Sequence, residues 1–351
     1  MISVGPVQLT DDSERVTDAD EEIFLLYTAL QAHPIPEDAH RGLGFLDSHH
    51  DTIEVVMELD EDPSASNVGS PSSSGPSTPA SEEPPTPNPK ASLKRPSNSR
   101  THSEGKHRST RHAHTRKIVK PLGPQSVQVE LYQDKTRLHT TKGDTGSVLW
   151  RASIDFARMV LRQYHHRSPE SFFERESLSE LRVLELGAGT GLLPVLLAPL
   201  VKHYTATDVA GLTHLISKNV HLNAADHHLS NVTVETLDWE LLHSTPVSRR
   251  RKAFPDDAPD LILAVDCIYH PSLVCPLVST INHFARPDRT IVVVVSELRA
   301  EDVLRGFLEA WLGSNGARWE IWHAGDGTDG PGLLGVPYVT WVGRKVSVPK
   351  V

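Results

Sequence analysis

The second half of the chain alternates between short apolar runs and longer amphipathic runs. From residue 181 onward the short runs predict strands, and the runs between them have the apolar spacing of helices. The runs at 260–265 and 290–295 are almost entirely apolar, which is typical of parallel strands covered on both faces. No long helix separates 319–323 from 338–346, and this predicts an antiparallel edge.

Strand and helix therefore follow each other regularly, and this order is that of an α/β fold with a doubly wound sheet of seven strands. The predicted strands are 182–186, 203–207, 232–235, 260–265, 290–295, 319–323 and 338–346. The predicted helices are 192–201, 211–223, 273–284 and 300–312.

The first half of the chain is less regular. Residues 21–32 have helical apolar spacing and end before Pro34, and 51–59 alternate like a strand. Residues 127–132 and the polar residues after them resemble a hairpin, and 150–164 predict a helix. We expect an acidic appendage over 1–62, an insertion over 63–120 and the α/β domain over 121–351.

The predicted insertion cannot build a core, because it is rich in Ser and Pro and then in Lys and Arg. The net charge of −10 conceals a strong asymmetry. Residues 1–89 carry 18 acidic and 2 basic side chains, whereas 90–120 carry 1 acidic and 10 basic. A basic tract of this kind is most often a solvated linker, and weak contact with RNA is the alternative. The segment 246–257 is predicted to be a second basic loop.

Only two cysteines occur, Cys267 and Cys275, and the chain starts with acidic rather than basic residues. We therefore expect a protein of the cytoplasm, with the nucleus as an alternative. The longest apolar run, 192–201, is short of the roughly 18 residues of a membrane span. The histidines lack the spacing of a zinc site, so no metal is expected.

A glycine-rich turn follows the first strand of the α/β domain. It reads Gly187-Ala188-Gly189-Thr190-Gly191 and comes just after Glu185. A dinucleotide loop needs a glycine where Leu192 stands, and a carboxylate so near repels a pyrophosphate. The same carboxylate suits the ammonium and sulfonium charges of S-adenosylmethionine. The remaining alternative is a glycine-rich turn that binds no ligand.

Polar and aromatic residues follow the next strands at the same edge of the sheet, where open α/β sheets bind their ligands. Asp208 would accept both ribose hydroxyls. Asp238 would accept from the adenine amino group, with Leu237 or Trp239 against the ring. The alternatives are that Asp238 caps a helix and that Trp239 is a core residue. The expected cofactor-binding residues are Trp150, Glu185, Gly187, Gly189, Gly191, Asp208, Leu237, Asp238, Trp239 and Val265.

Two residues after the fourth strand are candidates for an acceptor site. Methyl transfer is an in-line displacement in which the nucleophile must be neutral and held against the methyl carbon. Asp266 would orient an amine, and the faces of Tyr269 and Trp150 would hold its alkyl stem. Cys267 between them is expected to be a small buried residue.

At these residues the chain resembles family 16 of the seven-strand S-adenosylmethionine-dependent protein methyltransferases, many of which modify lysine. The resemblance rests on TGSVLWRAS (145–153), LELGAGTGLLP (184–194), ATDVAGL (206–212), LDW (237–239) and DCIYH (266–270), the last with a D-x-x-Y motif. It implies a Rossmann-like class I methyltransferase. It also implies cofactor contacts from Trp150, the glycine loop, Asp208 and Asp238, and a lysine site at Asp266 and Tyr269.

Within the family, the acidic amino-terminal part and GDTGSVLWRAS are most similar to the fungal ribosomal lysine methyltransferases, which implies a large-subunit ribosomal protein as substrate. The alternatives are another protein, such as a translation factor or chaperone, or a small amine. A non-catalytic binding subunit that keeps the fold is a further alternative.

Overall fold

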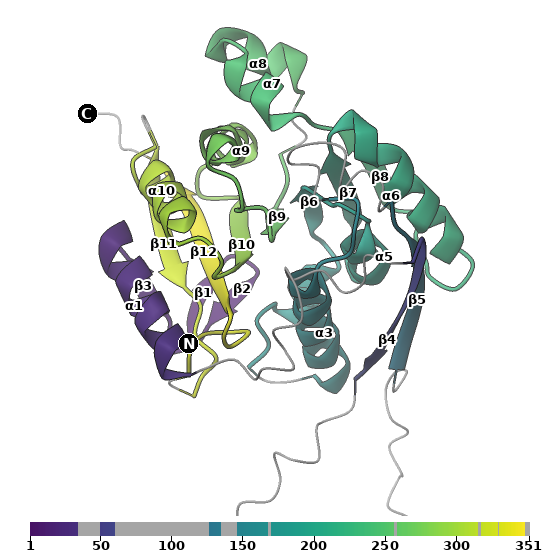
Figure 1. The fold of residues 1–351 in the computed structure, drawn as a ribbon, viewed down its shortest axis with the longest axis horizontal. Helices are drawn as coiled ribbons and strands as arrows, with labels where there is room; N and C mark the ends of the chain where they lie inside the picture. Colours follow the sequence, from purple (N-terminus) through teal and green to yellow (C-terminus); the bar gives the residue numbers. More distant parts are fainter. Residues whose placement is uncertain are drawn as a thin grey trace, which may run out of the picture. The chain divides into compact units, whose positions relative to one another are not determined.

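The structure is a computed structural model that describes residues 1–33, 50–59, 126–134, 146–167, 170–255, 258–314, 317–328 and 330–347 (Figure 1). Residues 1–60 and 122–351 form one compact unit. The predicted insertion at 63–120 lies outside the described residues.

The main sheet contains all seven predicted strands and one more. Its order is β3-β11-β12-β10-β9-β6-β7-β8. The bounds are β3 Glu14–Val16, β6 Arg182–Leu186, β7 His203–Asp208, β8 Val232–Thr236, β9 Leu261–Val265, β10 Ile291–Glu297, β11 Arg318–His323 and β12 Tyr338–Val346. The strands from β10 to β8 are parallel, as predicted from their apolar sequences.

The antiparallel part lies at the predicted end of the sheet and has three strands instead of the two predicted. β12 runs antiparallel to both β10 and β11, and β3 pairs antiparallel with β11 outside them. The edge strand β3 has only three residues, and only Val16 among them is buried. Three residues with one buried side chain give no alternating pattern, so the sequence did not predict this strand.

Helices cover both faces of the sheet, and the alternation of side chains along β10 shows the two layers. Val293 belongs to a core with α3 (Arg151–His166), α5 (Leu192–Leu197) and α6 (Ala210–Asn223). Its neighbours Val292 and Val294 point the other way, into a core with α1 (Ala19–Ala32), α9 (Pro271–Phe284) and α10 (Glu301–Leu312). Figure 1 shows α1 and α10 side by side.

Four short helical segments were not predicted: the 3-10 turn η2 (Ala198–Leu200), α4 (Arg175–Leu178), α7 (Trp239–Ser244) and α8 (Val247–Ala253). The predicted helix 192–201 changes at Ala198 into η2, where Pro199 has no N–H to donate. The predicted basic loop contains α8, which follows α7 and has no buried residue. Short elements complete the fold: β1 Ile2–Val4 and β2 Val7–Leu9.

The strand β5 (Ser126–Tyr132) has a partner that was not predicted. It pairs over its whole length with β4 (Thr52–Glu58), from Thr52 opposite Tyr132 to Glu58 opposite Ser126. The predicted hairpin involves the residues after β5, and residues 135–145 lie outside the described part of the chain. The observed partner β4 precedes the long insertion.

None of the helices in the described ranges is long and apolar enough to cross a membrane.

Candidate active site

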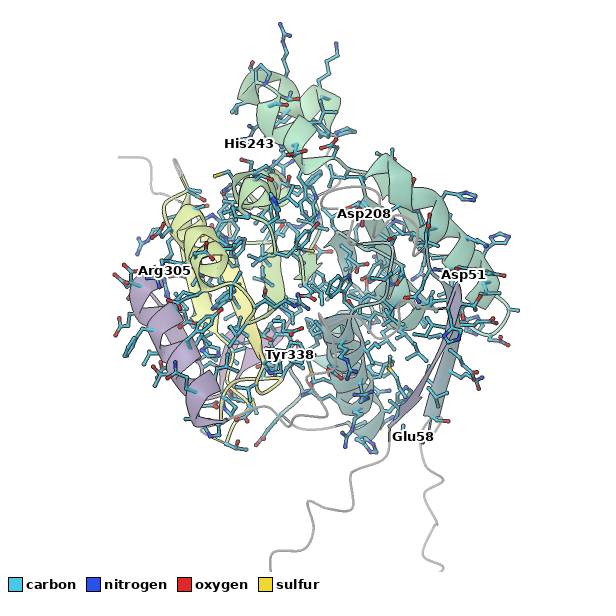
Figure 2. All side chains as sticks on the ribbon, viewed as in Figure 1. Asp51, Glu58, Asp208, His243, Arg305 and Tyr338 are labelled. Atoms are coloured by element: carbon cyan, nitrogen blue, oxygen red, sulfur yellow. The ribbon has the colours of Figure 1, made fainter. Side chains whose placement is uncertain are left out.

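A cavity of about 410 Å³ lies at the carboxyl ends of the parallel strands. Ten of the predicted site residues line it: Trp150, Gly187, Gly189, Asp208, Leu237, Asp238, Trp239, Val265, Asp266 and Tyr269. They come from the segment before α3 and from the ends of β6, β7, β8 and β9; Figure 2 labels Asp208 at the end of β7. The topology therefore brings together residues up to 119 positions apart in the sequence.

Two glycines of the loop are required by both conformation and space. Gly187 and Gly189 have φ of +76° and +57°, which disfavours side chains. A Cβ on Gly187 would lie 2.8 Å from Cys267 Sγ, and one on Gly189 would lie 3.0 Å from the carbonyl oxygen of Gly146. The loop can therefore pass close to a ligand only because these positions have no side chain.

Asp208 is fixed by the loop that it faces. Its Oδ2 accepts from the Gly189 amide and its Oδ1 from the Val209 amide, both at 2.8 Å. A carboxylate has only acceptor oxygens, as a pair of ribose hydroxyls requires, and Asp208 lines the cavity. Its contact with a ribose stays a prediction.

At the third strand end, Asp238 has the capping role that was the alternative to adenine binding, and it also lines the cavity. It caps α7, with Oδ1 accepting from the Leu241 amide at 3.0 Å. The Trp239 ring lies near Gly187, where a Cβ would approach it to 3.2 Å. Trp239 Nε1 is buried and has no hydrogen-bond partner among the described residues.

Two predicted cofactor residues do not line the cavity. Gly191 faces Ile216 of α6. The buried Glu185 instead accepts a hydrogen bond from Tyr204 Oη at 3.0 Å. Burial, with a further contribution from the charge of Asp208, raises the pKa of Glu185 to about 8 although the bond from Tyr204 lowers it. The side chain is thus engaged by Tyr204 inside the protein, and its predicted contact with the cofactor stays a prediction.

Asp266, at one end of the cavity, forms an ion pair that sequence reasoning missed. Both oxygens of Asp266 accept from Arg299, at 2.8 Å each, and Arg299 also donates to Glu297 at 2.6 Å. The guanidinium lies 4.8 Å from the centre of the Trp150 ring. The carboxylate that was predicted to orient an amine is thus already engaged by a cation. Arg299 follows β10 outside any motif, so no signal in the sequence pointed to it.

Gly146 is the other residue that the sequence analysis did not assign. It packs against Gly189, and a Cβ there would lie 2.6 Å from Leu212 Cδ1. Its signals were its place in the turn before Trp150 and within the TGSVLWRAS motif. The further residues that line the cavity are Val148, Leu149, Ser153, Thr190, Val209, Leu212, Glu240, Cys267, His270, Ser272 and Leu273. Cys267 is buried, as predicted.

The sequence profile of a protein family described as lysine methyltransferase matches residues 133–310, just over half of the chain. The chain belongs to this lysine methyltransferase family. The match covers the glycine loop, Asp208 and the D-x-x-Y residues, and it confirms the predicted family and methyltransferase class.

Three similar proteins align with this chain over part of their own length. A diaminohydroxyphosphoribosylamino-pyrimidine deaminase of Schizosaccharomyces pombe is 34% identical over 194 residues, covering 55% of this chain and 43% of that protein. A ribosomal lysine N-methyltransferase 5 of Zygosaccharomyces rouxii is 28% identical over 204 residues, covering 47% and 63%. A protein N-lysine methyltransferase METTL21A of Danio rerio is 32% identical over 174 residues, covering 50% and 68%. The chain thus spans less than two thirds of the first two.

The cavity of this lysine methyltransferase family member fits S-adenosylmethionine, the predicted cofactor, which the family confirms. Asp208 offers acceptors for a ribose, and the glycine loop leaves space that side chains would fill. The unpartnered Trp239 Nε1 offers a donor beside that space. When bound, the cofactor supplies a methyl group on a positively charged sulfur. No group of three potential metal ligands occurs among the described residues.

Proposed function

We propose that this protein is an S-adenosylmethionine-dependent protein-lysine N-methyltransferase. The observation that carries the proposal is that Trp150, Asp266 and Tyr269 line the same cavity as Gly189 and Asp208. A methyl donor and an acceptor amine would therefore share one enclosure.

The chain's own residues would mainly orient the acceptor and exclude water. Trp150 and Tyr269 offer aromatic faces for the alkyl stem of a lysine, whose amino group also interacts with such faces. Asp266, held by Arg299, offers a fixed carboxylate at the end of that path. S-adenosylmethionine would supply its methyl group to the lone pair of the neutral amine, the electrons of the broken bond staying on sulfur, and the resulting ammonium would release its proton to solvent. Positioning of this kind accounts for much of the barrier reduction in such displacements.

We propose a large-subunit ribosomal protein as the favoured substrate. The similarity to a ribosomal lysine N-methyltransferase 5 supports this choice, as does the acidic amino-terminal part, since ribosomal proteins are basic. Methylation in the cytoplasm, with the nucleus as the alternative site, belongs to the same proposal. The exposed cations of α8 and the basic tract at 90–120 would add weak contacts with ribosomal RNA.

Labelling a lysate tests the proposal. The purified protein is incubated with methyl-labelled S-adenosylmethionine and a lysate lacking the activity, and the labelled protein is identified by mass spectrometry. We expect label on lysine of a large-subunit ribosomal protein. Label on a translation factor or chaperone would refute the substrate, and label only on nucleic acid or a metabolite would refute protein methylation.

A matched control separates chemistry from cofactor binding. Asp266→Ala should abolish labelling while S-adenosylmethionine still binds, measured by calorimetry. Gly189→Arg should abolish both, because the new side chain would fill the loop. Wild-type protein that shows no binding at millimolar ligand would identify a non-catalytic subunit and overturn the proposal.

A further inference from the structure

Arg299 lies behind the acceptor end of the cavity rather than in it, because it contacts Asp266 and Trp150, which line the cavity, but does not line it itself. We propose that Arg299 is a positioning residue that fixes Asp266 and, together with Glu297, sets the charge experienced by the acceptor amine. The proposal rests on the proposed function, because it concerns the amine methylated at that site.

The geometry holds Asp266 in one orientation. Asp266 directly follows β9, has a φ of +59° and donates its amide to the carbonyl of Val295 at 2.7 Å. Its side chain is 2% exposed and faces a guanidinium through two parallel bonds of 2.8 Å. Two-point pairing of this kind fixes the plane of a carboxylate, which a lysine could not do.

Arg299 is itself held from three sides. Asp266 contacts it from the end of β9, Glu297 from the end of β10 and the Trp150 ring from the segment before α3. Although burial lowers the pKa of the Arg299 guanidinium, its bonds and charges with Asp266 and Glu297 outweigh burial and raise it. The guanidinium therefore stays cationic at every pH at which the enzyme could work.

The combined charge of Asp266, Arg299 and Glu297 affects whether the acceptor amine is protonated. Lysine has an ordinary pKa of about 10.4, and only its neutral form can attack. A buried carboxylate without a partner would hold the lysine as an ammonium, which binds well but does not react. Arg299 pairs with both Asp266 and Glu297, so these three side chains together carry a net charge of −1 instead of the −2 of the two carboxylates alone. The structure thus has a fixed carboxylate that does not lock the acceptor in its unreactive form.

Other titratable groups near this cluster are not expected to reproduce the effect. Asp155 of α3 is already paired with Arg158 and accepts from Tyr338 Oη of β12. Burial raises the pKa of the Tyr338 phenol and of the Cys267 thiol, so both stay neutral near pH 7. Glu185 of β6, with a pKa of about 8, contributes equally to every variant below. The other titratable groups that line the cavity are Tyr269, His270, Asp208, Asp238 and Glu240, and they too are the same in every variant.

Two substitutions should move the pH profile in opposite directions. Arg299→Met removes the cation, so the rising limb of kcat against pH should shift up by about one unit and activity at neutral pH should fall about tenfold. Glu297→Gln removes the remaining negative charge, so the limb should shift down, by up to about one unit. Arg299→Lys keeps the charge but loses the two-point geometry, so kcat should fall while the limb stays near that of the wild type.

The experiment measures kcat and KM from pH 6.5 to 10 with the protein substrate found by lysate labelling. Calorimetry with S-adenosylmethionine and thermal unfolding accompany each variant. The matched control is Arg289→Met, which breaks an ion pair with Asp260 at the opposite ends of the same two strands. It should leave the profile unchanged.

Each outcome decides the matter. Opposite shifts of the limb support the proposal. If kcat falls in every variant but the rising limb does not move, Arg299 has only a structural role. If Arg299→Met has the same kcat and the same pH profile as the wild type, Arg299 has no role in the reaction. If Arg299→Met does not fold, Glu297→Gln decides alone: an unmoved limb overturns the proposal. An inactive wild type would instead refute the proposed function.

Discussion

The amide of Asn219, in α6, donates to the carbonyl oxygen of Thr190, in the glycine loop, at 2.8 Å. The same side chain donates to the carbonyl of Tyr132 at 2.9 Å and accepts from its amide at 2.7 Å. Asn219 is fully buried. One side chain therefore connects the loop that bounds the cofactor cavity to β5, the strand that follows the insertion.

Asn219→Ala should weaken both folding and cofactor binding. The substitution leaves buried backbone groups of Tyr132 and Thr190 without partners, at a cost of about 2–4 kcal/mol. Urea unfolding and calorimetry with S-adenosylmethionine measure the two effects. The matched control is Asn231→Ala, because Asn231 bonds the carbonyls of Ala198 and Val201, which do not line the cavity. Equal losses of cofactor affinity in both variants would contradict this assignment.

Gly187→Ala should reduce cofactor affinity more than the addition of a single methyl group would suggest. The left-handed backbone costs an alanine about 1–2 kcal/mol, and the new Cβ would lie 2.8 Å from Cys267 Sγ. We expect a lower melting temperature and weaker binding by calorimetry. Gly306→Ala is the control: its Cβ would meet nothing within 4 Å in α10, so it should stabilise the protein by up to about 1 kcal/mol.

Asp208→Asn should weaken cofactor binding at least about tenfold, because a ribose loses a charged acceptor. One of the amides of Gly189 and Val209 would also face a donor instead of an oxygen. Calorimetry provides the affinity. Asp260→Asn is the control, since Asp260 also accepts from a backbone amide, that of Arg182, but lies at the other end of the sheet. Unchanged affinity in Asp208→Asn would remove Asp208 from the cofactor site.

Glu185 should make folding less favourable as the pH rises. Its pKa is about 8 in the folded protein against an ordinary value near 4.5, so the folded state binds the proton more tightly. The contribution of Glu185 to the free energy of unfolding should therefore be greatest below about pH 4.5, fall by up to about 1.4 kcal/mol per pH unit between pH 4.5 and 8, and level off above. Urea unfolding at pH 5.5, 7 and 8.5 should show this slope in the wild type and its loss in Glu185→Gln. Parallel slopes would exclude a protonated Glu185.

Most of the central sheet could be predicted from the sequence, because its strands are both long and apolar. β9 and β10 are examples: all but one of their residues are buried, and no solvated helix has that composition. β3 and the pairing of β4 with β5 could not be predicted. β3 is too short to show a period, and 67 residues separate Glu58 from Ser126.

Some residues of the site could likewise be predicted from the sequence, and others could not. Glycines and acids that directly follow strands could be placed, because topology brings strand ends together. Glu185 could not, because its position in β6 fixes neither the direction of its side chain nor the phenol of Tyr204 that meets it. Arg299 was missed because its role depends on three contacts from different elements, and no spacing in the sequence encodes them.

The pairing of β4 with β5 also has a practical meaning. Glu58 lies opposite Ser126, so the points where the chain leaves and rejoins the described fold are only about 5 Å apart (Figure 2 labels Glu58). Whatever lies between them can be lengthened, shortened or replaced by a reporter domain at a small entropic cost. The segment between Glu58 and Ser126 is therefore a suitable insertion site. A different sequence can be placed there without changing the residues that line the cavity.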